Sequence, residues 1–373
     1  MTDLEEQPGF RSLGQATART IVQQAALRDR LQRTLLVHGP AGADKAAFVD
    51  DLLALLLCTA ADPAARPCNV CRGCREARAH THPDLVIGSP ASWRDDRSST
   101  GSIVAAARRW LADSAGAPIA GERRVVVVEG VDQANEQIQN VLLKALEEPT
   151  GRHMFILVAD EASRVLPTIQ SRAQSLRIGA VPRAELVGWL IDRHRLPADQ
   201  ADALARISDG LSGTAADFVE KPERVAWRRQ TQHELLDLLA RGPADRFASA
   251  RDLLDEAARI YREPVGDAGD AGDDQGDGRR VATAFQRLGA LRIVDAWIGL
   301  TRDLLVTTAG RPDMAPSAIL ELDVAGPAMR TDPAQLAAFV SLLERMRDGL
   351  RQSAAPQLAM QVAMLSWPTI SPR

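Results

Sequence analysis

The sequence contains no hydrophobic run long enough to cross a bilayer. Its longest apolar stretch, 52-LLALLLC-58, is only a fraction of the length that a membrane-spanning helix needs. The first ten residues, MTDLEEQPGF, are acidic and include no apolar segment of the signal-peptide kind. We therefore expect a cytoplasmic protein.

Aromatic residues and excess charge are also scarce. Phe, Trp and Tyr make up 4% of the chain, and the formal net charge is −4. Proteins that bind nucleic acid on their own usually carry a basic surface, often with interleaved aromatic side chains. The sequence thus argues against a zinc-dependent nucleic-acid binder that acts alone, and any DNA contact is expected to be local or shared with partner subunits.

Cysteine is rare, and all of it is gathered in one short window. The residues are Cys58, Cys68, Cys71 and Cys74. In a reducing cytoplasm such a cluster indicates a metal site rather than disulfides. Four thiolates predict a closed, tetrahedral, structural zinc site that fastens the insert 58–74 to the preceding helix. The alternative is one buried core cysteine and three free thiols. His80 and His82 are further candidate ligands, but the four cysteines already fill the coordination sphere.

The first half of the chain alternates short apolar runs with helical patterns. Helices are expected over 44–57 and 133–148, the second ending at Pro149. Strands are expected at 34–38, 84–88, 124–129, 153–159 and 174–178. Nearly continuous hydrophobicity in these strands is typical of a parallel sheet covered on both faces, so the fold class is α/β.

Helical patterns dominate after about residue 180. They predict a small helical domain over 181–223 and an all-helical domain over 224–373, following an α/β domain over 1–180. One segment, 266-GDAGDAGDDQGDG-278, has no apolar side chain larger than Ala. We expect it to form a flexible acidic loop, because it cannot bury enough surface to offset the entropy of ordering.

The stretch 36-LVHGPAGADKAAF-48 resembles a phosphate-binding loop with two positions altered. A working loop reads G-x-x-x-x-G-K-[ST] between a strand and a helix. Gly39, Gly42 and Lys45 are in register, but Asp44 replaces the last Gly and Ala46 replaces the hydroxyl residue that holds Mg²⁺. The turn is expected to persist; whether it binds a nucleotide is left open between a plain strand-to-helix turn and a divergent active loop.

A nucleotide-hydrolysing protein of this type also needs acids at the tip of a second strand. In 125-VVVVEG-130 this position holds Glu129 and Gly130, and a glycine cannot polarise water. Asp132 is close in sequence but is expected to point elsewhere.

The segment 165-VLPTIQSRAQSLRI-178 predicts a short helix that begins at Pro167 and carries Ser171 and Arg172. An arginine at the edge of such a domain can reach a phosphate bound by a neighbouring subunit. An ordinary surface arginine is the alternative.

Taken together, these motifs resemble the δ′ family of the bacterial DNA polymerase III clamp loader, a branch of the AAA+ proteins. The resemblance runs from about residue 14 to about 219, and the helical remainder matches in size and character only. The pieces that carry it are 14-GQ-15, 39-GPAGADK-45, the four-Cys insert, 125-VVVVEGVD-132, 140-NVLLKALEEP-149 and 168-TIQSR-172.

The resemblance implies an AAA+-type P-loop domain, a helical lid and a helical collar, in a subunit that has lost ATP hydrolysis. It implies that Arg172 is an arginine finger acting on a neighbour's ATP, with Ser171 beside it; Ala173 stands where the family usually has Cys. The sensor positions map near Asp160 and onto Gly213, and neither residue can donate to phosphate.

The partners that the resemblance implies are the γ/τ motor subunits, the δ subunit, the sliding clamp and primer–template DNA in a hetero-oligomer. The chain would then be a subunit of a DNA-directed DNA polymerase holoenzyme, with structural zinc of its own and ATP only at the interface with a neighbour. An active clamp-loader-type ATPase with a divergent loop is the alternative, and it predicts ATP turnover by the isolated chain that is lost on Lys45→Ala.

Overall fold

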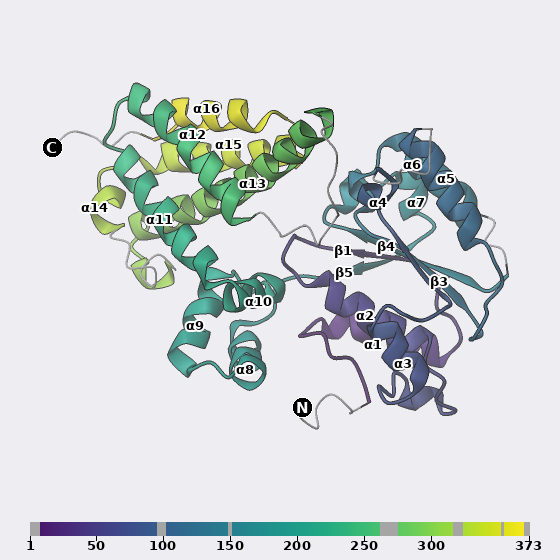
Figure 1. The fold of residues 1–373 in the computed structure, drawn as a ribbon. Coiled ribbons are helices and arrows are strands. Elements are labelled where there is room, and N and C mark those ends of the chain that lie inside the picture. Colours follow the sequence, from purple (N-terminus) through teal and green to yellow (C-terminus); the bar gives the residue numbers. More distant parts are fainter. Residues whose placement is uncertain are drawn as a thin grey trace. The chain divides into compact units, whose positions relative to one another are not determined.

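The computed structural model describes residues 8–94, 102–147, 151–261, 275–315, 324–351 and 354–368. The chain divides into two compact units, residues 1–215 and 216–373 (Figure 1). The first unit contains a sheet covered by helices, and the second is built from helices. This agrees with the predicted α/β fold that is followed by a helical part.

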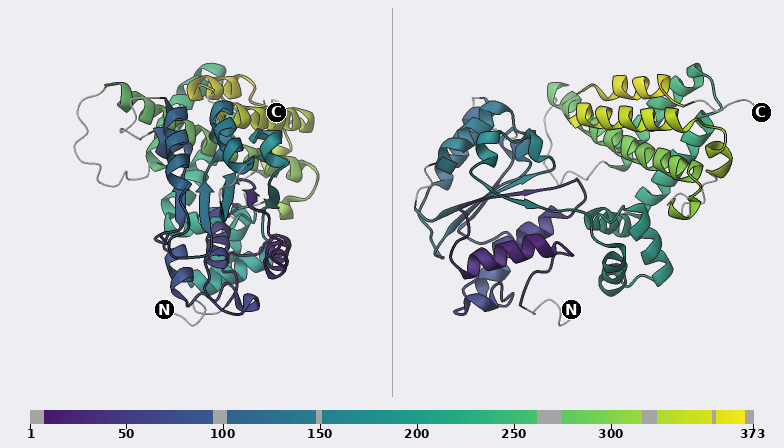
Figure 2. Two further views of the ribbon diagram at one scale, coloured as in Figure 1. Left: turned by 90° about the vertical axis from the view of Figure 1, so that its right-hand side faces the viewer. Right: turned by 180° about the vertical axis from the view of Figure 1, so that it is seen from behind.

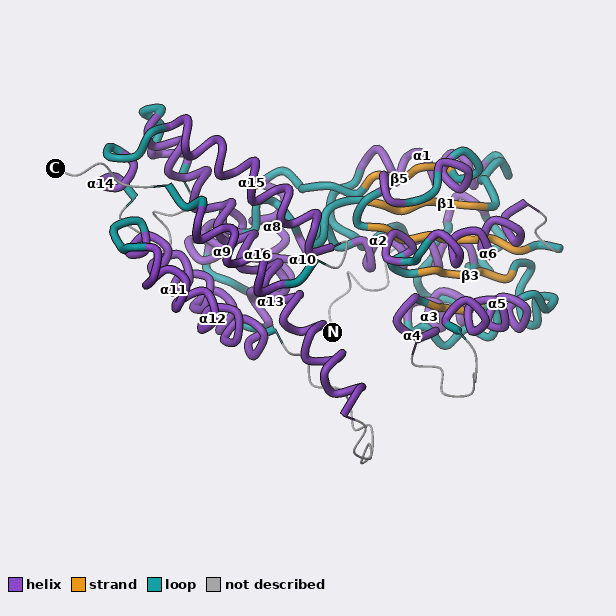
Figure 3. The backbone as a smooth tube through the Cα atoms, turned by 90° about the horizontal axis from the view of Figure 1, so that it is seen from above, coloured by secondary structure: helices purple, strands orange, loops and turns teal. Residues whose placement is uncertain are grey.

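The sheet of the first unit is parallel throughout and has the strand order β2-β3-β4-β1-β5. Figure 3 shows the strands lying side by side. The strands are β1 (Thr34–His38), β2 (Leu85–Gly88), β3 (Arg124–Val128), β4 (His153–Ala159) and β5 (Gln174–Arg177). All five expected strands are confirmed, with ends shifted by at most one residue.

Alternating side chains of each strand enter two separate hydrophobic cores. Leu35 and Val37 pack in one core with Phe48 of α2, whereas Leu36 packs in the other with Leu142 of α6. Helices α1 and α2 cover one face, and α5 and α6 cover the opposite face, as both Figures 1 and 2 show. The bounds are α1 (Ala16–Leu27), α2 (Lys45–Leu56), α3 (Arg72–Arg78), α4 (Pro90–Arg94), α5 (Ile103–Ser114), α6 (Glu136–Glu147) and α7 (Pro167–Gln170).

Helix α2 agrees with its prediction to within one residue at each end, whereas two other helices differ more. Helix α6 begins at Glu136 rather than at 133, because the Asn135 side chain accepts the backbone N–H of Ile138 and starts the helix there. Helix α7 ends at Gln170, so Ser171 and Arg172 follow the helix instead of lying within it. Their N–H groups still bond back to Pro167 and Ile169 in a final tight turn.

The strand-free region after residue 180 begins with three short helices. These are α8 (Arg183–His194), α9 (Ala198–Ile207) and α10 (Ser212–Glu220). Val181, just after β5, donates its N–H to the carbonyl oxygen of Gly210, just before α10, at 2.8 Å. The start of α10 is thereby fixed close to the end of β5.

The second unit is organised around the long helix α13. Helices α12, α15 and α16 pack against it, and Trp297 of α13 is fully buried beside Trp367, with ring centroids 5.2 Å apart. Figure 2 shows α13 and α15 running alongside each other, in green to yellow. The bounds are α11 (Pro222–Leu238), α12 (Pro243–Ile260), α13 (Gln275–Thr308), α14 (Ala325–Ala328), α15 (Pro333–Arg351) and α16 (Pro356–Leu365).

Only part of the predicted acidic loop over 266–278 lies among the described residues. Residues 266–274 lie outside the described residues, whereas 275–278 form the first turn of α13, so the loop prediction is wrong for those four positions. Extending an existing helix by a turn costs little compared with starting one. The three-part division at 180 and 223 stays a prediction. Among the described residues, no helix has the length and apolar character to cross a membrane.

Candidate functional site

The loop between β1 and α2 has the turn geometry of a phosphate-binding loop. Gly39 has φ +156°, and a Cβ there would lie 1.8 Å from the carbonyl oxygen of Ile178, so no other residue fits. Its N–H donates to the Ala159 carbonyl at the end of β4, 3.2 Å away. Gly42 has φ +85° and is crowded in the same way by Thr214. The altered sequence has therefore kept the turn.

Asp44 occupies the position of the missing glycine and adopts the left-handed conformation that a glycine would supply. Its φ is +54°, a region that costs a non-glycine residue about 1–2 kcal/mol. Asp44 caps α2, where its carboxylate accepts the N–H of Ala47 at 3.3 Å. Burial raises the pKa of this carboxyl above its ordinary value. A negative group thus lies at the helix N-terminus, where a phosphate would otherwise be bound.

Lys45 has its ammonium group bonded entirely within the chain. Nζ donates to the carbonyl oxygens of Gly39 at 2.8 Å and Pro40 at 3.0 Å. It also forms an ion pair with Oδ1 of Asp160 at 2.7 Å. An ammonium has three donors, so these three acceptors use all of them. Only 10% of the Lys45 side chain is exposed.

The tip of the second strand, β3, carries one acidic residue followed by a glycine. Glu129 is exposed at the end of β3, and Gly130 turns the chain with φ +61°. Asp132 is buried, and its Oδ2 accepts the N–H groups of Asp160 and Glu161, both at 3.1 Å. Burial raises the pKa of the Asp132 carboxyl. Its role here is to hold the backbone that follows β4.

The start of α10 lies directly against the loop. The N–H groups of Gly213 and Thr214 both donate to the carbonyl oxygen of Gly42, at 2.9 and 3.2 Å. A Cβ on Gly213 would lie 2.9 Å from that same oxygen. Gly213 was predicted as a residue too short to reach phosphate; the structure adds that its smallness lets α10 approach the loop. Neither the contact by Thr214 nor the Lys45–Asp160 pair was foreseen from the sequence, because no local pattern signals them.

Arg172 lies on the surface of the first unit, just past α7. Its Nη1 donates to the Thr168 carbonyl at 3.0 Å, and its Nη2 pairs with Oε1 of Glu147 at 2.8 Å. The Arg172 and Glu147 side chains are 42% and 47% exposed. The neighbouring Ser171 is also exposed, and its hydroxyl donates to Thr168. The structure therefore presents the arginine outward and places it beside the end of α6.

The four cysteines converge on one point. Their Sγ atoms all lie within 4.8 Å of one another. The Sγ separations are 3.6 Å for Cys58 to Cys68, 3.9 Å for Cys58 to Cys71 and 4.0 Å for Cys68 to Cys74. Sulfurs around a zinc at 2.3 Å in a tetrahedron are about 3.8 Å apart, so the donor set and its spacing fit structural zinc.

Backbone N–H groups support the cysteine cluster. The N–H groups of Cys71 and Cys74 donate to the Sγ of Cys68 and Cys71, at 3.4 and 3.3 Å. Although burial opposes ionisation of Cys71, hydrogen bonds from Thr59, Cys74 and Cys68 bring its pKa down to about 6. Burial raises the pKa of Cys74. The two histidines lie apart from the sulfurs: His80 pairs with Asp50 at 2.7 Å, and His82 accepts the N–H of Asp84.

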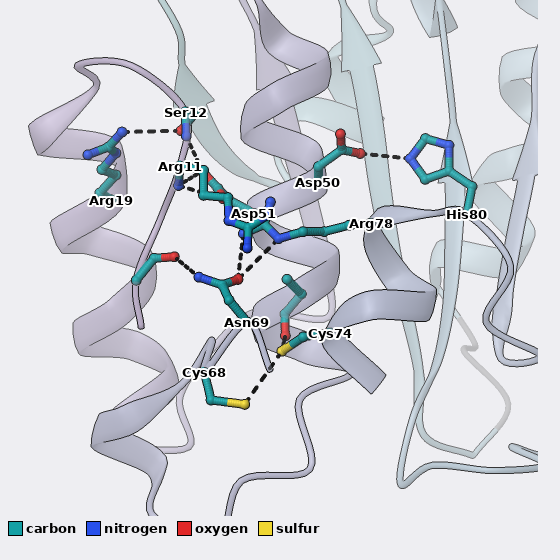
Figure 4. A network of polar contacts seen from close by, with 12 residues as sticks. Arg11, Ser12, Arg19, Asp50, Asp51, Cys68, Asn69, Cys74, Arg78 and His80 are labelled. Atoms are coloured by element: carbon teal, nitrogen blue, oxygen red, sulfur yellow. Dashed lines mark hydrogen bonds and ion pairs between the residues drawn. The ribbon is translucent and has the colours of Figure 1, made fainter. Parts of the chain in front are cut away.

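A buried polar network connects the cysteine insert to α2 (Figure 4). Asp51 of α2 is fully buried, pairs with Arg78 of α3 at 2.7 Å and accepts the N–H groups of Arg11 and Ser12. Asn69 accepts from Arg78 and donates to the carbonyl of Gly9. The helix that begins at Lys45 is thus fastened to both the insert and the N-terminal segment.

Comparison with known proteins finds similarities for the first part of the chain. Residues 14–182 match the family described as DNA polymerase III, delta subunit. DNA polymerase III subunit delta' of Pseudomonas aeruginosa is 33% identical over 184 residues, which cover 48% of this chain and 52% of the relative. DNA polymerase III subunit gamma/tau of Mycobacterium tuberculosis (strain H37Rv) is 30% identical over 154 residues, 41% of this chain and 25% of the relative.

Among solved structures, a DNA polymerase III gamma subunit-related protein from Thermotoga maritima aligns with a TM-score of 0.38 and 14% identity, over 93% of this chain and 97% of that one. The matched segment spans about half the length of the delta' relative. The resemblance to the δ′ family that the motifs predicted is confirmed for this part of the chain.

Proposed function

Because residues 14–182 match the DNA polymerase III delta family, we propose that the chain is an ATPase-inactive δ′-type subunit of the clamp loader. In this role it helps to load the sliding clamp onto primed DNA and supplies Arg172 to the ATP site of a neighbouring motor subunit. The observation that carries the proposal is the bonding of the Lys45 ammonium group. Its three donors are directed at two backbone carbonyls and at Asp160.

The groups that ATP hydrolysis requires support the proposed inactivity, in addition to the Lys45–Asp160 ion pair. Hydrolysis needs a cation for the terminal phosphate, a ligand for Mg²⁺ and an acid to orient water. Lys45 is already bonded, Ala46 has no hydroxyl, and Gly130 has no side chain. Asp160 places a carboxylate where a donor to phosphate would be needed. Each change acts in the same direction.

The finger role rests on the exposure of Arg172 and on its position. A guanidinium can stabilise the phosphate of a neighbouring site only if it projects from its own domain. Arg172 does so, and its partner Glu147 is itself exposed, so the pair can exchange for a phosphate at little cost. Ser171 and the turn after α7 position it.

Assembly with partners is assigned to the helical part of the chain. The predicted collar, 224–373, contains α11 to α16 apart from the first residues of α11, and it would pack with the γ/τ and δ subunits in a hetero-oligomer. The sliding clamp and primer–template DNA would be engaged through the whole complex, in the cytoplasm. Bound zinc would be held by Cys58, Cys68, Cys71 and Cys74 and would stabilise the insert without taking part in catalysis.

The test is reconstitution with candidate motor and δ subunits, comparing the wild type with Arg172→Ala. We expect both to assemble, with DNA-stimulated ATP hydrolysis falling sharply in the variant, since an arginine finger contributes about 10³–10⁵ in rate at its own site. Arg177→Ala, an exposed arginine on β5, is the matched control and should leave hydrolysis unchanged.

Two results would overturn the proposal. Normal hydrolysis by the Arg172→Ala assembly would remove the finger role. Steady ATP turnover by the purified chain, lost on Lys45→Ala, would establish instead an active ATPase with a divergent loop.

A further inference from the structure

We propose that the carboxylate of Asp160 acts as a built-in anion in the phosphate-binding loop, which makes residues 39–45 a latent binding site for inorganic pyrophosphate. In the wild type the site is filled by the protein's own side chain. Loss of the negative charge at position 160 would open it. The inference deepens the proposed function, on whose non-hydrolysing loop it rests, by naming the group that keeps phosphates out.

The first step is the bonding of the Lys45 ammonium. A phosphate would need at least one of its three donors, yet all three are directed at oxygens of the chain at 2.7 to 3.0 Å. Two of these oxygens are neutral carbonyls within the loop itself. The third, Oδ1 of Asp160, carries the only charge among the three, and it is the shortest contact. Asp160 therefore occupies the place that an anionic ligand would take.

The second step is the positioning of Asp160. Its backbone N–H and that of Glu161 are both held by Oδ2 of Asp132, which is 4% exposed. Asp160 directly follows β4, and β4 pairs with β1, the strand that leads into the loop. The carboxylate is thus brought to Lys45 by sheet pairing and a buried anchor, rather than by a chance contact of two flexible side chains.

The third step is the integrity of the rest of the loop. Gly39 and Gly42 keep the conformations that turn the loop, and Ala43 closes it with an N–H bond to the Pro40 carbonyl at 3.1 Å. The Gly213 and Thr214 contacts are made to the Gly42 carbonyl, which is not a group that binds anions. Once Asp160 is replaced by a neutral residue, the Lys45 ammonium and the turn of residues 39–45 are still in place to bind a small anion. Asp44 caps α2 and remains a second carboxylate at the loop, so its removal is included in the test.

The experiment measures binding of inorganic pyrophosphate to the full chain by calorimetry at low ionic strength. We expect Asp160→Asn to bind pyrophosphate at least about tenfold more tightly than the wild type, because it keeps the shape and a hydrogen-bond acceptor but removes the charge. The double variant Asp160→Asn/Lys45→Ala should lose this gain. Asp50→Asn is the control, because it removes one carboxylate from α2 whose partner is His80 and not Lys45.

Several outcomes would overturn the inference. Pyrophosphate binding by the wild type as strong as by Asp160→Asn would do so, as would a gain in Asp160→Asn that survives loss of Lys45 or appears equally in Asp50→Asn. If Asp160→Asn binds nothing, Asp44→Gly/Asp160→Asn is measured, and a second failure rejects the latent site. Each of these leaves the clamp-loader role untouched, since that role is tested by Arg172 in the assembly.

Discussion

Arg172 and Glu147 form an ion pair with nitrogen and oxygen 2.8 Å apart, connecting the turn after α7 to the last residue of α6. Both side chains are nearly half exposed, which places the pair among surface salt bridges of small energetic value. The pair orients the guanidinium on the surface without burying it.

Glu147→Gln should leave the folded state almost unchanged. Exposed pairs contribute about 0.2–1 kcal/mol, so we expect the free energy of unfolding in urea to fall by no more than about 1 kcal/mol. Arg172→Ala, which removes the other partner, should have an effect of the same size. A loss above about 2 kcal/mol in both variants would mean that the pair is structural, and it would weaken the case for a mobile finger.

Zinc should be present in the purified chain at one ion for each molecule. Cys71→Ser should lower the metal content, because three thiolates bind zinc less tightly than four. It should also expose the insert 58–74 to proteolysis. His80→Ala is the matched control, since His80 pairs with Asp50 and not with the sulfurs. Elemental analysis checks both; equal zinc loss in the two variants would contradict the four-cysteine site.

Asp51→Ala should be among the most destabilising single substitutions in the first unit. Asp51 is fully buried, and its removal takes away the ion-pair partner of Arg78 and a carboxylate that accepts the N–H groups of Arg11 and Ser12. Breaking a buried pair by removing one member costs about 3–5 kcal/mol. Asp50→Asn, at the next position of α2, should cost less than about 1 kcal/mol. The comparison is made by thermal and urea unfolding, and similar losses for the two would refute this reading of the network.

Asp84→Asn should reveal a pH-dependent contribution to stability. Burial alone would raise the pKa of Asp84, but N–H groups of Ile119, Ala120 and Gly121 donate to its carboxylate at 2.5 to 2.9 Å and hold the pKa below its ordinary value. A lowered folded-state pKa stabilises the protein above the unfolded value of about 3.9, and this stability is lost as the pH falls through the folded value.

The variant should therefore be less stable than the wild type by about 1–3 kcal/mol at pH 7, with the difference shrinking below about pH 4. Unfolding in urea across pH 3 to 8 measures this. Asp113→Asn, an exposed residue of α5, is the control and should show no such trend. A difference that is constant with pH would rule out ionisation as its source.

The strands and helix α2 could be predicted from the sequence, because hydrophobic periodicity is a local property. All five strands were found this way. The short helices α3 and α4 were missed, since a few residues cannot establish a period. The start of α6 was missed because Asn135 acts as a cap that outweighs the helical pattern around it.

The candidate site was predictable only in part. The cysteine cluster, the retained glycines and the exposed Arg172 follow from spacing and motif. The pairing of Lys45 with Asp160, of Arg172 with Glu147, and of Asp51 with Arg78 does not. These pairs join residues far apart in the chain, and each depends on which elements become neighbours.

The sequence by itself determined that this is an α/β protein with a parallel sheet, a cluster of four cysteines, and a loop in the register of a phosphate-binding loop with its last glycine and its hydroxyl residue replaced, because residue type and spacing carry that information. Only the tertiary structure decided which group pairs with Lys45 of this loop. The sheet places β4 beside β1, so the residue that follows β4 reaches the lysine that follows β1, and the two charges neutralise each other.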